Sequence, residues 1–190
     1  ARGYQVRCND IAQRSVIVGH ALIANDRVRL AREDVVRLFA PADANAHFVE
    51  ASLAPDIVTV RHARFLDNAL GVANAVPEPK RALLRLLIVR YLYGQRPMGN
   101  FGAKTVVHQA EAGDFDAINP AFIKHMVQKC VAAHPRTLCD SIAESINRGV
   151  FAGAGPCSVS VGDAAEFLRR VDADIAVMDP PYPGTSDYGK

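Results

Sequence analysis

The sequence predicts an α/β fold in which part of a doubly wound parallel sheet is interrupted by a large, mostly helical insertion. Three short segments have the apolar or alternating character of strands: residues 4–8, 157–161 and 175–178. Residues 31–149 are divided by prolines into pieces of helix length. We therefore expect residues 1–30 and 150–190 to be parts of one domain and residues 31–149 to be an insertion in it.

The first predicted strand, residues 4–8, is followed by Asn9-Asp10 and then by a helical pattern whose apolar positions include Val16 and Leu22. An acidic residue at the end of a strand in a doubly wound sheet is placed to bind the hydroxyls of a ribose. Asp10 is therefore a candidate for cofactor binding. An equally good explanation is that Asp10 caps the helix that follows.

The insertion contains three clear helix candidates. Residues 80–93 are the most apolar and should be buried on more than one side. Asn119-Pro120 supplies a cap and a first-turn proline for the second helix. The third helix carries apolar residues at a spacing of four and should stop at Gly149.

A basic loop follows the most apolar helix. Residues 80–110 contain six lysines and arginines and no acidic residue. Cations contact phosphates, amides read base edges, and an aromatic ring occupies the gap left by an extruded base. We expect four residues of this loop to contact DNA: Arg96, Asn100, Phe101 and Lys104. The alternative is a plain surface loop beside a buried helix.

The C-terminal part predicts a strand, a helix and a second strand. Residues 157–161 alternate as a strand does, Gly162-Asp163 ends it, and residues 164–171 carry helical spacing before residues 175–178. A unit of this length is a right-handed crossover that joins parallel strands. We therefore expect Asp163 and Asp179 to lie at the same edge of the sheet, where open α/β sheets bind ligands.

The motif Asp179-Pro180-Pro181-Tyr182 has the chemistry to hold an exocyclic amine of a nucleobase. The lone pair of such an amine is delocalised into the ring, and bonding both hydrogens favours the pyramidal nitrogen that attacks a methyl donor. The Asp179 carboxylate accepts one hydrogen and the Pro180 carbonyl the other, and neither proline has an N–H that competes for these acceptors. Tyr182 offers a ring on which a flipped base stacks. The alternative is that the prolines simply end a strand.

Three motifs together resemble the D12 class of DNA adenine N6-methyltransferases, the Dam-like group: Cys8-Asn9-Asp10-Ile11, Val161-Gly162-Asp163-Ala164 and Asp179-Pro180-Pro181-Tyr182. The resemblance implies a partial Rossmann-like sheet that binds S-adenosylmethionine. It implies that Asp10 binds the cofactor ribose and Asp163 the amino group of the cofactor adenine, with Ile11 and Ala164 beside them. It also implies that the final motif holds a flipped adenine of double-stranded DNA and that the insertion recognises the target.

The family's glycine-rich cofactor loop, of the form Phe-x-Gly-x-Gly, should precede the strand that contains Cys8, where this sequence has no room for it. The segment Phe151-Ala152-Gly153-Ala154-Gly155 has similar spacing. Such a loop needs a strand before it and a helix after it, whereas a helical pattern precedes this segment and a strand follows it. We interpret it as a connection, and expect the chain to be an internal part of a longer protein.

Composition and charge are those of a globular protein, with 190 residues, 49% hydrophobic content and a net charge of +2. No apolar run reaches the roughly 18 residues of a membrane span, and the start lacks a signal-peptide pattern. The four cysteines and six histidines lack the spacing of a metal site. We expect a cytoplasmic protein with free thiols, no metal and no membrane contact.

Related substrates remain open from the sequence. N4-cytosine methylation of DNA and N2-guanine methylation of ribosomal RNA use similar active-site motifs, and Asp at position 179 favours adenine among them. A noncatalytic DNA-binding remnant of the fold is an alternative of another class.

Overall fold

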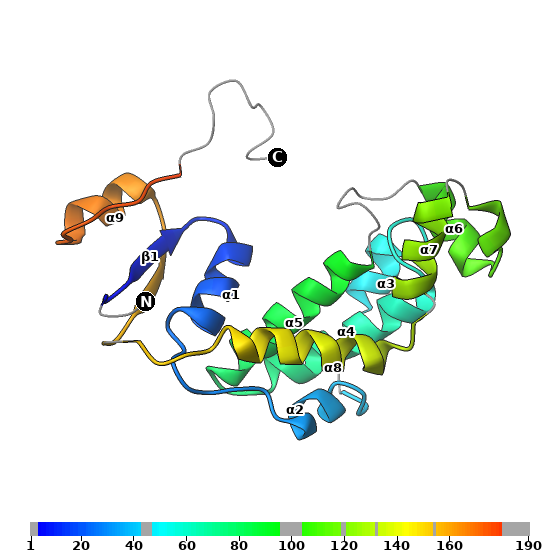
Figure 1. Cartoon of the computed structure of the whole chain (residues 1–190), viewed down its shortest axis with the longest axis horizontal. Helices are drawn as coiled ribbons and strands as arrows, with labels where there is room; N and C mark the ends of the chain where they lie inside the picture. Colours follow the sequence, from blue (N-terminus) through cyan, green and yellow to red (C-terminus); the bar gives the residue numbers. More distant parts are fainter. Residues whose placement is uncertain are drawn as a thin grey trace.

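The computed structural model describes residues 4–42, 47–95, 104–118, 121–131, 133–153 and 155–179. Most of these residues are helical (Figure 1). The elements in chain order are β1 (Arg7–Asp10), α1 (Gln13–Leu22), α2 (Arg32–Arg37), α3 (Phe48–Leu53), α4 (Val60–Asn74), α5 (Lys80–Gly94), α6 (Lys104–Glu111), the 3-10 helix η1 (Phe115–Ala117), α7 (Ala121–Cys130), α8 (Pro135–Arg148), β2 (Ser158–Val161) and α9 (Ala164–Arg170).

Strands β1 and β2 pair in parallel, with Arg7 opposite Ser158 and Asp10 opposite Val161. These strands confirm the first two strand predictions, although β1 lies later in the chain than expected and ends at Asp10. Helix α1 covers one face of the sheet and α9 lies on the other side (Figure 1). The described residues therefore contain a small parallel α/β unit beside a larger body of helices.

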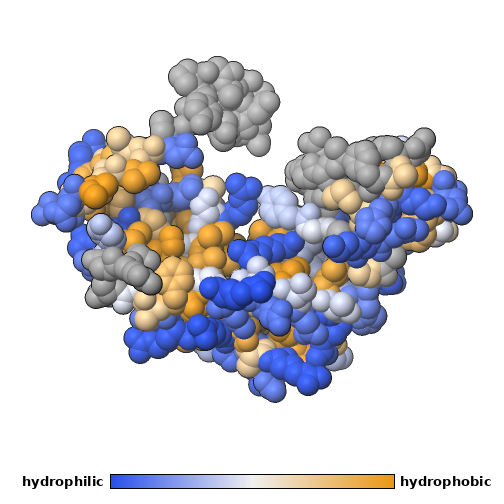
Figure 2. All heavy atoms as spheres, in the orientation of Figure 1, coloured by the Kyte–Doolittle hydropathy of each residue, from blue (hydrophilic) through white to orange (hydrophobic). Residues whose placement is uncertain are grey.

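The prediction of a third strand at residues 175–178 is wrong. The segment has no regular secondary structure, and Ile175 and Val177 are 71% and 92% exposed. A strand forms where a neighbour accepts its backbone hydrogen bonds, and in the described part of the chain the only strand pair is β1 with β2. In the space-filling view, hydrophobic residues lie at the surface on the left side of the molecule, where α9 lies (Figure 2). The predicted crossover is accordingly not formed among the described residues, where the sheet has two strands.

Helix α5 is the centre of the hydrophobic core. Its sequence is apolar on several sides, and buried residues such as Leu83, Leu84 and Leu86 point in different directions from it. It packs against α1, α4 and α8. Burial of each large side chain contributes about 1.5–3 kcal/mol, so this one helix supports much of the fold.

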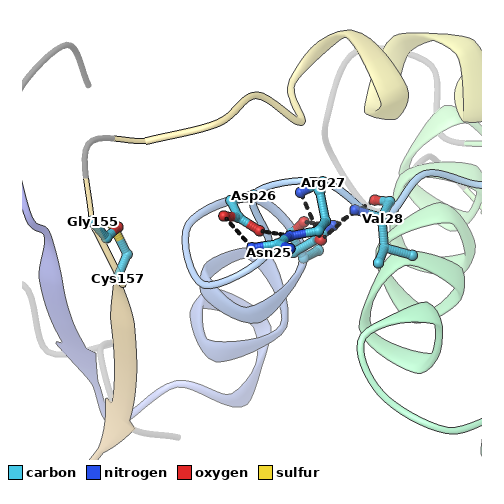
Figure 3. Close-up of polar contacts among 7 residues, drawn as sticks. Asn25, Asp26, Arg27, Val28, Gly155 and Cys157 are labelled. Carbon is cyan, nitrogen blue, oxygen red and sulfur yellow. Dashed lines mark hydrogen bonds and ion pairs between the residues drawn. The ribbon is translucent and has the colours of Figure 1, made fainter.

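The loop after α1 is fixed by Asn25, which is buried (Figure 3). Its side-chain amide donates to the Ala21 carbonyl at 3.1 Å and to the Val28 carbonyl at 2.7 Å. Its side-chain oxygen accepts from the Val28 backbone N–H at 2.9 Å. Because its donors and its acceptor are all used, Asn25 turns the chain from the sheet region into the helical body at little cost in desolvation.

Helices α6 and α7, with η1, enclose a separate small cluster of apolar side chains around Val127 and Ile118. The N-terminal turn of α4 connects this cluster to the main core. Arg61 donates to the Val131 carbonyl at 2.8 Å, and the Val60 N–H donates to Glu111 Oε2 at 2.8 Å. His62 also bonds to the Val131 carbonyl, at 2.8 Å. Polar contacts rather than a large apolar interface therefore hold these outer helices.

Candidate cofactor edge of the sheet

The carboxyl ends of β1 and β2 lie side by side. The Gly162 N–H donates to the Asp10 carbonyl at 3.3 Å, and the Asn9 side chain donates to the Gly162 carbonyl at 2.8 Å. Asp10 ends β1, and Asp163 follows β2 by two residues. Two carboxylates separated by about 150 residues in the chain thus emerge at one edge of the sheet.

Of the two roles that the sequence left open for Asp10, the structure shows the local one. Its Oδ1 accepts from the Ala12 N–H at 2.8 Å and so fixes the turn into α1. This bond and a weaker contribution from the Ser15 hydroxyl lower the pKa of Asp10, so the group is ionised at neutral pH. A carboxylate has room for further donors. Ile11, the next residue, is exposed.

Asp163 is the N-cap of α9. Its Oδ1 accepts from the Glu166 N–H at 3.0 Å, and its side chain is exposed. Ala164 begins α9 and is also exposed. Capping explains in part why an acidic residue occupies position 163. The exposed carboxylate also has acceptor positions that the bond from Glu166 does not use.

A polar network that the sequence analysis missed fixes the two strand ends to each other. The Ser160 hydroxyl lies 2.9 Å from Asn9 Oδ1 and 3.3 Å from the Cys8 carbonyl. Asn9 in turn holds the loop at Gly162, whose φ of 155° is unusual for a residue with a side chain. The alternating serines of β2 were a signal for a polar face, but their partners in β1 could not be seen from spacing.

Two open cavities of about 510 Å³ each flank this edge. The α1 cavity lies between the sheet, α1 and α5; its lining includes Asp10, Arg14, Val16, Leu86, Tyr93 and Val159. The α9 cavity lies between the sheet and α9; its lining includes Arg7, Ser160, Asp163, Phe167 and Arg170. Asn9 borders both. Each volume is in the range of small-molecule sites.

The final predicted motif is described only at Asp179, which is exposed. Pro180, Pro181 and Tyr182 lie outside the described residues. A strand at residues 175–178 would bring Asp179 to the sheet edge, and that strand is not formed. The structure therefore brings Asp10 and Asp163 together and does not bring Asp179 to them through a sheet.

Of the predicted DNA contacts, Arg96, Asn100 and Phe101 lie outside the described residues. Lys104 begins α6, where its Nζ lies 2.6 Å from Asp56 Oδ2. This ion pair and the neighbouring His108 lower the pKa of Asp56. Because a carboxylate already neutralises Lys104, its charge is less available to a phosphate than the sequence suggested.

Comparison of the chain with protein-family models, with curated proteins and with solved structures gives no match. Across the described ranges, no group of three or more His, Cys, Asp or Glu side chains is arranged to hold a metal ion. Within the same ranges, no helix has both the length and the apolar character needed to cross a membrane.

Proposed function

We propose that this protein is a DNA methyltransferase that uses S-adenosylmethionine and modifies the N6 amine of a flipped adenine. The observation that carries the proposal is the parallel pairing of β1 with β2, which sets Asp10 and Asp163 at one sheet edge between two cavities of ligand size. In doubly wound folds, nucleotide cofactors bind at such an edge.

The donor set fits the nucleoside part of the cofactor. Asp10 is a fixed carboxylate with its pKa lowered, which suits hydrogen bonds from ribose hydroxyls. Asp163 is an exposed acceptor for an amino group, and Asn9 stands between the two cavities as a further polar side chain. S-Adenosylmethionine, when bound, would supply a reactive methyl group.

The chain's own contribution to the reaction would come from the motif at residues 179–182. The Asp179 carboxylate and the Pro180 carbonyl would accept the two hydrogens of the target amine, and Tyr182 would stack on the base. Asp179 would also hold the proton that the amine loses. Support for this part of the proposal comes from the motif and its chemistry, since a poor nucleophile gains from fixed acceptors.

The first prediction concerns methyl transfer. The protein should transfer labelled methyl groups from S-adenosylmethionine to duplex DNA, and nucleoside digestion should recover the label in N6-methyladenine. Asp179→Ala should lower the rate by about 100-fold or more, the usual cost of removing one preorganised electrostatic contact. The matched control is Asp172→Ala, which removes another exposed aspartate from the same segment.

Three results would count against this proposal. Label in cytosine, or only in RNA, would change the substrate. A rate for Asp179→Ala equal to that of Asp172→Ala would remove Asp179 from the reaction. No transfer by protein that is folded and binds DNA would favour a noncatalytic DNA-binding role.

A further inference from the structure

Two arginines and a tyrosine lie together in the α1 cavity. Arg14, in the first turn of α1, donates from Nη1 to the Tyr93 hydroxyl at 2.9 Å. Tyr93 belongs to the last turn of α5, and Arg90 precedes it by three residues, so both lie on one side of that helix. Helices α1 and α5 pack side by side (Figure 1). All three side chains border the same cavity.

Two of the other cations of α5 lie near carboxylates, and the third contacts a neutral amide. Lys80 is bonded to the Asp34 carboxylate at 2.8 Å, Arg81 lies near Glu78, and Arg85 donates to the Asn74 side-chain oxygen at 2.8 Å. Among the described residues, Arg90 has one hydrogen-bond partner, the Ser145 hydroxyl, at 3.3 Å. Among the described residues, neither Arg14 nor Arg90 forms an ion pair with a carboxylate.

The lining of this cavity carries two guanidinium groups against the single carboxylate of Asp10, and this excess of positive charge favours an anion there. Arginine has a rigid fork of N–H donors that matches the oxygens of a phosphate. Tyr93 adds an aromatic ring that is 42% exposed, and such rings accompany basic residues where proteins hold nucleic acid strands. The apolar floor of the cavity, which includes Val16, Leu86 and Val89, suits the sugar next to a phosphate.

The position of the cavity agrees with a nucleic acid strand. It borders Asp10 at the proposed cofactor edge, and α5 leads directly from Tyr93 into the predicted DNA-contacting loop. Small free anions would fill little of a volume of about 510 Å³.

We propose that the α1 cavity binds the phosphodiester backbone of the DNA strand that carries the target base, with Arg14 and Arg90 each contacting a phosphate. Tyr93 holds the Arg14 guanidinium in place through its hydroxyl. This inference rests on the proposed function for the identity of the nucleic acid, and adds a contact surface outside the predicted loop.

The test is the salt dependence of DNA binding, measured by fluorescence anisotropy with a labelled duplex over a range of KCl concentrations. Log K falls as log salt rises, and each lost phosphate contact makes this slope shallower by about 0.9. The double variant Arg14→Gln/Arg90→Gln should therefore bind more weakly, with a slope that is shallower by about 1.8. The double variant Arg14→Lys/Arg90→Lys should keep most of the slope, because it keeps both positive charges.

The matched control is Arg85→Gln, which removes an arginine from the same helix outside the cavity lining. The proposal is overturned if the double Gln variant and Arg85→Gln have the same slope, or if the folded wild-type protein does not bind the duplex. A second measurement needs no variant: DNA should protect Arg14 and Arg90, but not the exposed Arg27, from phenylglyoxal in the wild-type protein. Equal modification with and without DNA would also overturn it.

This experiment separates the inference from the proposed function. Binding that depends on Arg14 and Arg90 without methyl transfer would keep the surface and reject the enzyme. Methyl transfer to DNA that is indifferent to both arginines would keep the enzyme and reject the surface.

Discussion

At Gly19, helix α1 approaches the sheet more closely than a side chain would allow. A Cβ atom built at this position would lie 2.9 Å from both methyl groups of Val159 and 3.4 Å from the Cys8 sulfur. Val159 lies in β2, and its β-branched side chain has little freedom to change rotamer. Glycine here thus sets the distance between α1 and the strands that carry the candidate site.

The second prediction follows from this contact. Gly19→Ala should lower the free energy of unfolding by roughly 1–3 kcal/mol, the usual cost of overpacking, although alanine is the better helix former. Urea unfolding followed by circular dichroism measures the change. Gly94→Ala is the control, because its Cβ would meet no atom of the described structure within 4 Å, and it should be neutral or slightly stabilising.

A double variant tests the reason for the loss. Val159→Ala removes the two methyl groups that the new Cβ would meet, so Gly19→Ala should cost less in that background. If the losses of stability from Gly19→Ala and Val159→Ala simply add in the double variant, the contact with Val159 is not the reason that Gly19→Ala destabilises the protein.

Single residues were predictable from the sequence where their role is local. Asp10 ends a strand, Asp163 follows one, and both precede helices and fix the turn as a capping residue would. The bonds of Asn9 were not predictable, because its partner Ser160 lies 151 residues away. Asn25 acts locally, yet its burial depends on the packing of distant helices, which spacing alone does not reveal.

At the scale of elements, His62 joins three helices. Its Nδ1 accepts from the Tyr91 hydroxyl on α5, and its Nε2 donates to the Val131 carbonyl after α7 at 2.8 Å. Both bonds are satisfied by the neutral ring with its proton on Nε2. Burial lowers the pKa of His62, the Val131 carbonyl opposes this, and nearby Arg61 and Glu111 act in opposite directions.

The third prediction is a pH dependence with a definite sign. The unfolded chain takes up a proton at His62 near its ordinary pKa of about 6.5, while the native state does so only at lower pH. The free energy of unfolding should therefore fall as the pH drops below about 6.5, with a slope from this group of at most about 1.4 kcal/mol per pH unit.

Urea unfolding of the wild type and of His62→Gln between about pH 5 and pH 7.5 measures this slope. His62→Gln should be less stable at every pH but show a flatter dependence. His20→Gln, which removes an exposed histidine from α1, serves as the control. Equal slopes for the wild type and His62→Gln would show that the buried histidine does not titrate as proposed.

Helices were easier to predict than the sheet. The apolar helix at residues 80–93 and the helix that stops at Gly149 correspond to α5 and α8, because helical bonds and periodicity are local. Strands depend on a neighbour, and residues 175–178 show the consequence. A short apolar run has the composition of a buried strand, but without a strand beside it the segment stays exposed.

At the scale of the whole molecule, the candidate site depends on a long-range closure. The chain leaves β1, builds the helical body from α2 to α8, and returns to pair β2 with β1. Helix α1 packs on both the sheet and α5, so the sheet is attached to the same core as the helices predicted to be an insertion. The sequence indicated both strands, but the shared core follows from tertiary packing.

The fourth prediction tests the proposed binding of the S-adenosylmethionine nucleoside at the edge beyond β1 and β2, by calorimetric titration with S-adenosylhomocysteine. The protein should bind one equivalent, and Asp10→Asn should weaken binding about tenfold or more, since a hydrogen bond to a charged group contributes about 1.5–3 kcal/mol. Asp26→Asn, which alters a loop carboxylate paired with Arg27, should bind as the wild type does. No binding by the folded protein, or equal affinities for Asp10→Asn and Asp26→Asn, would contradict the proposed binding site.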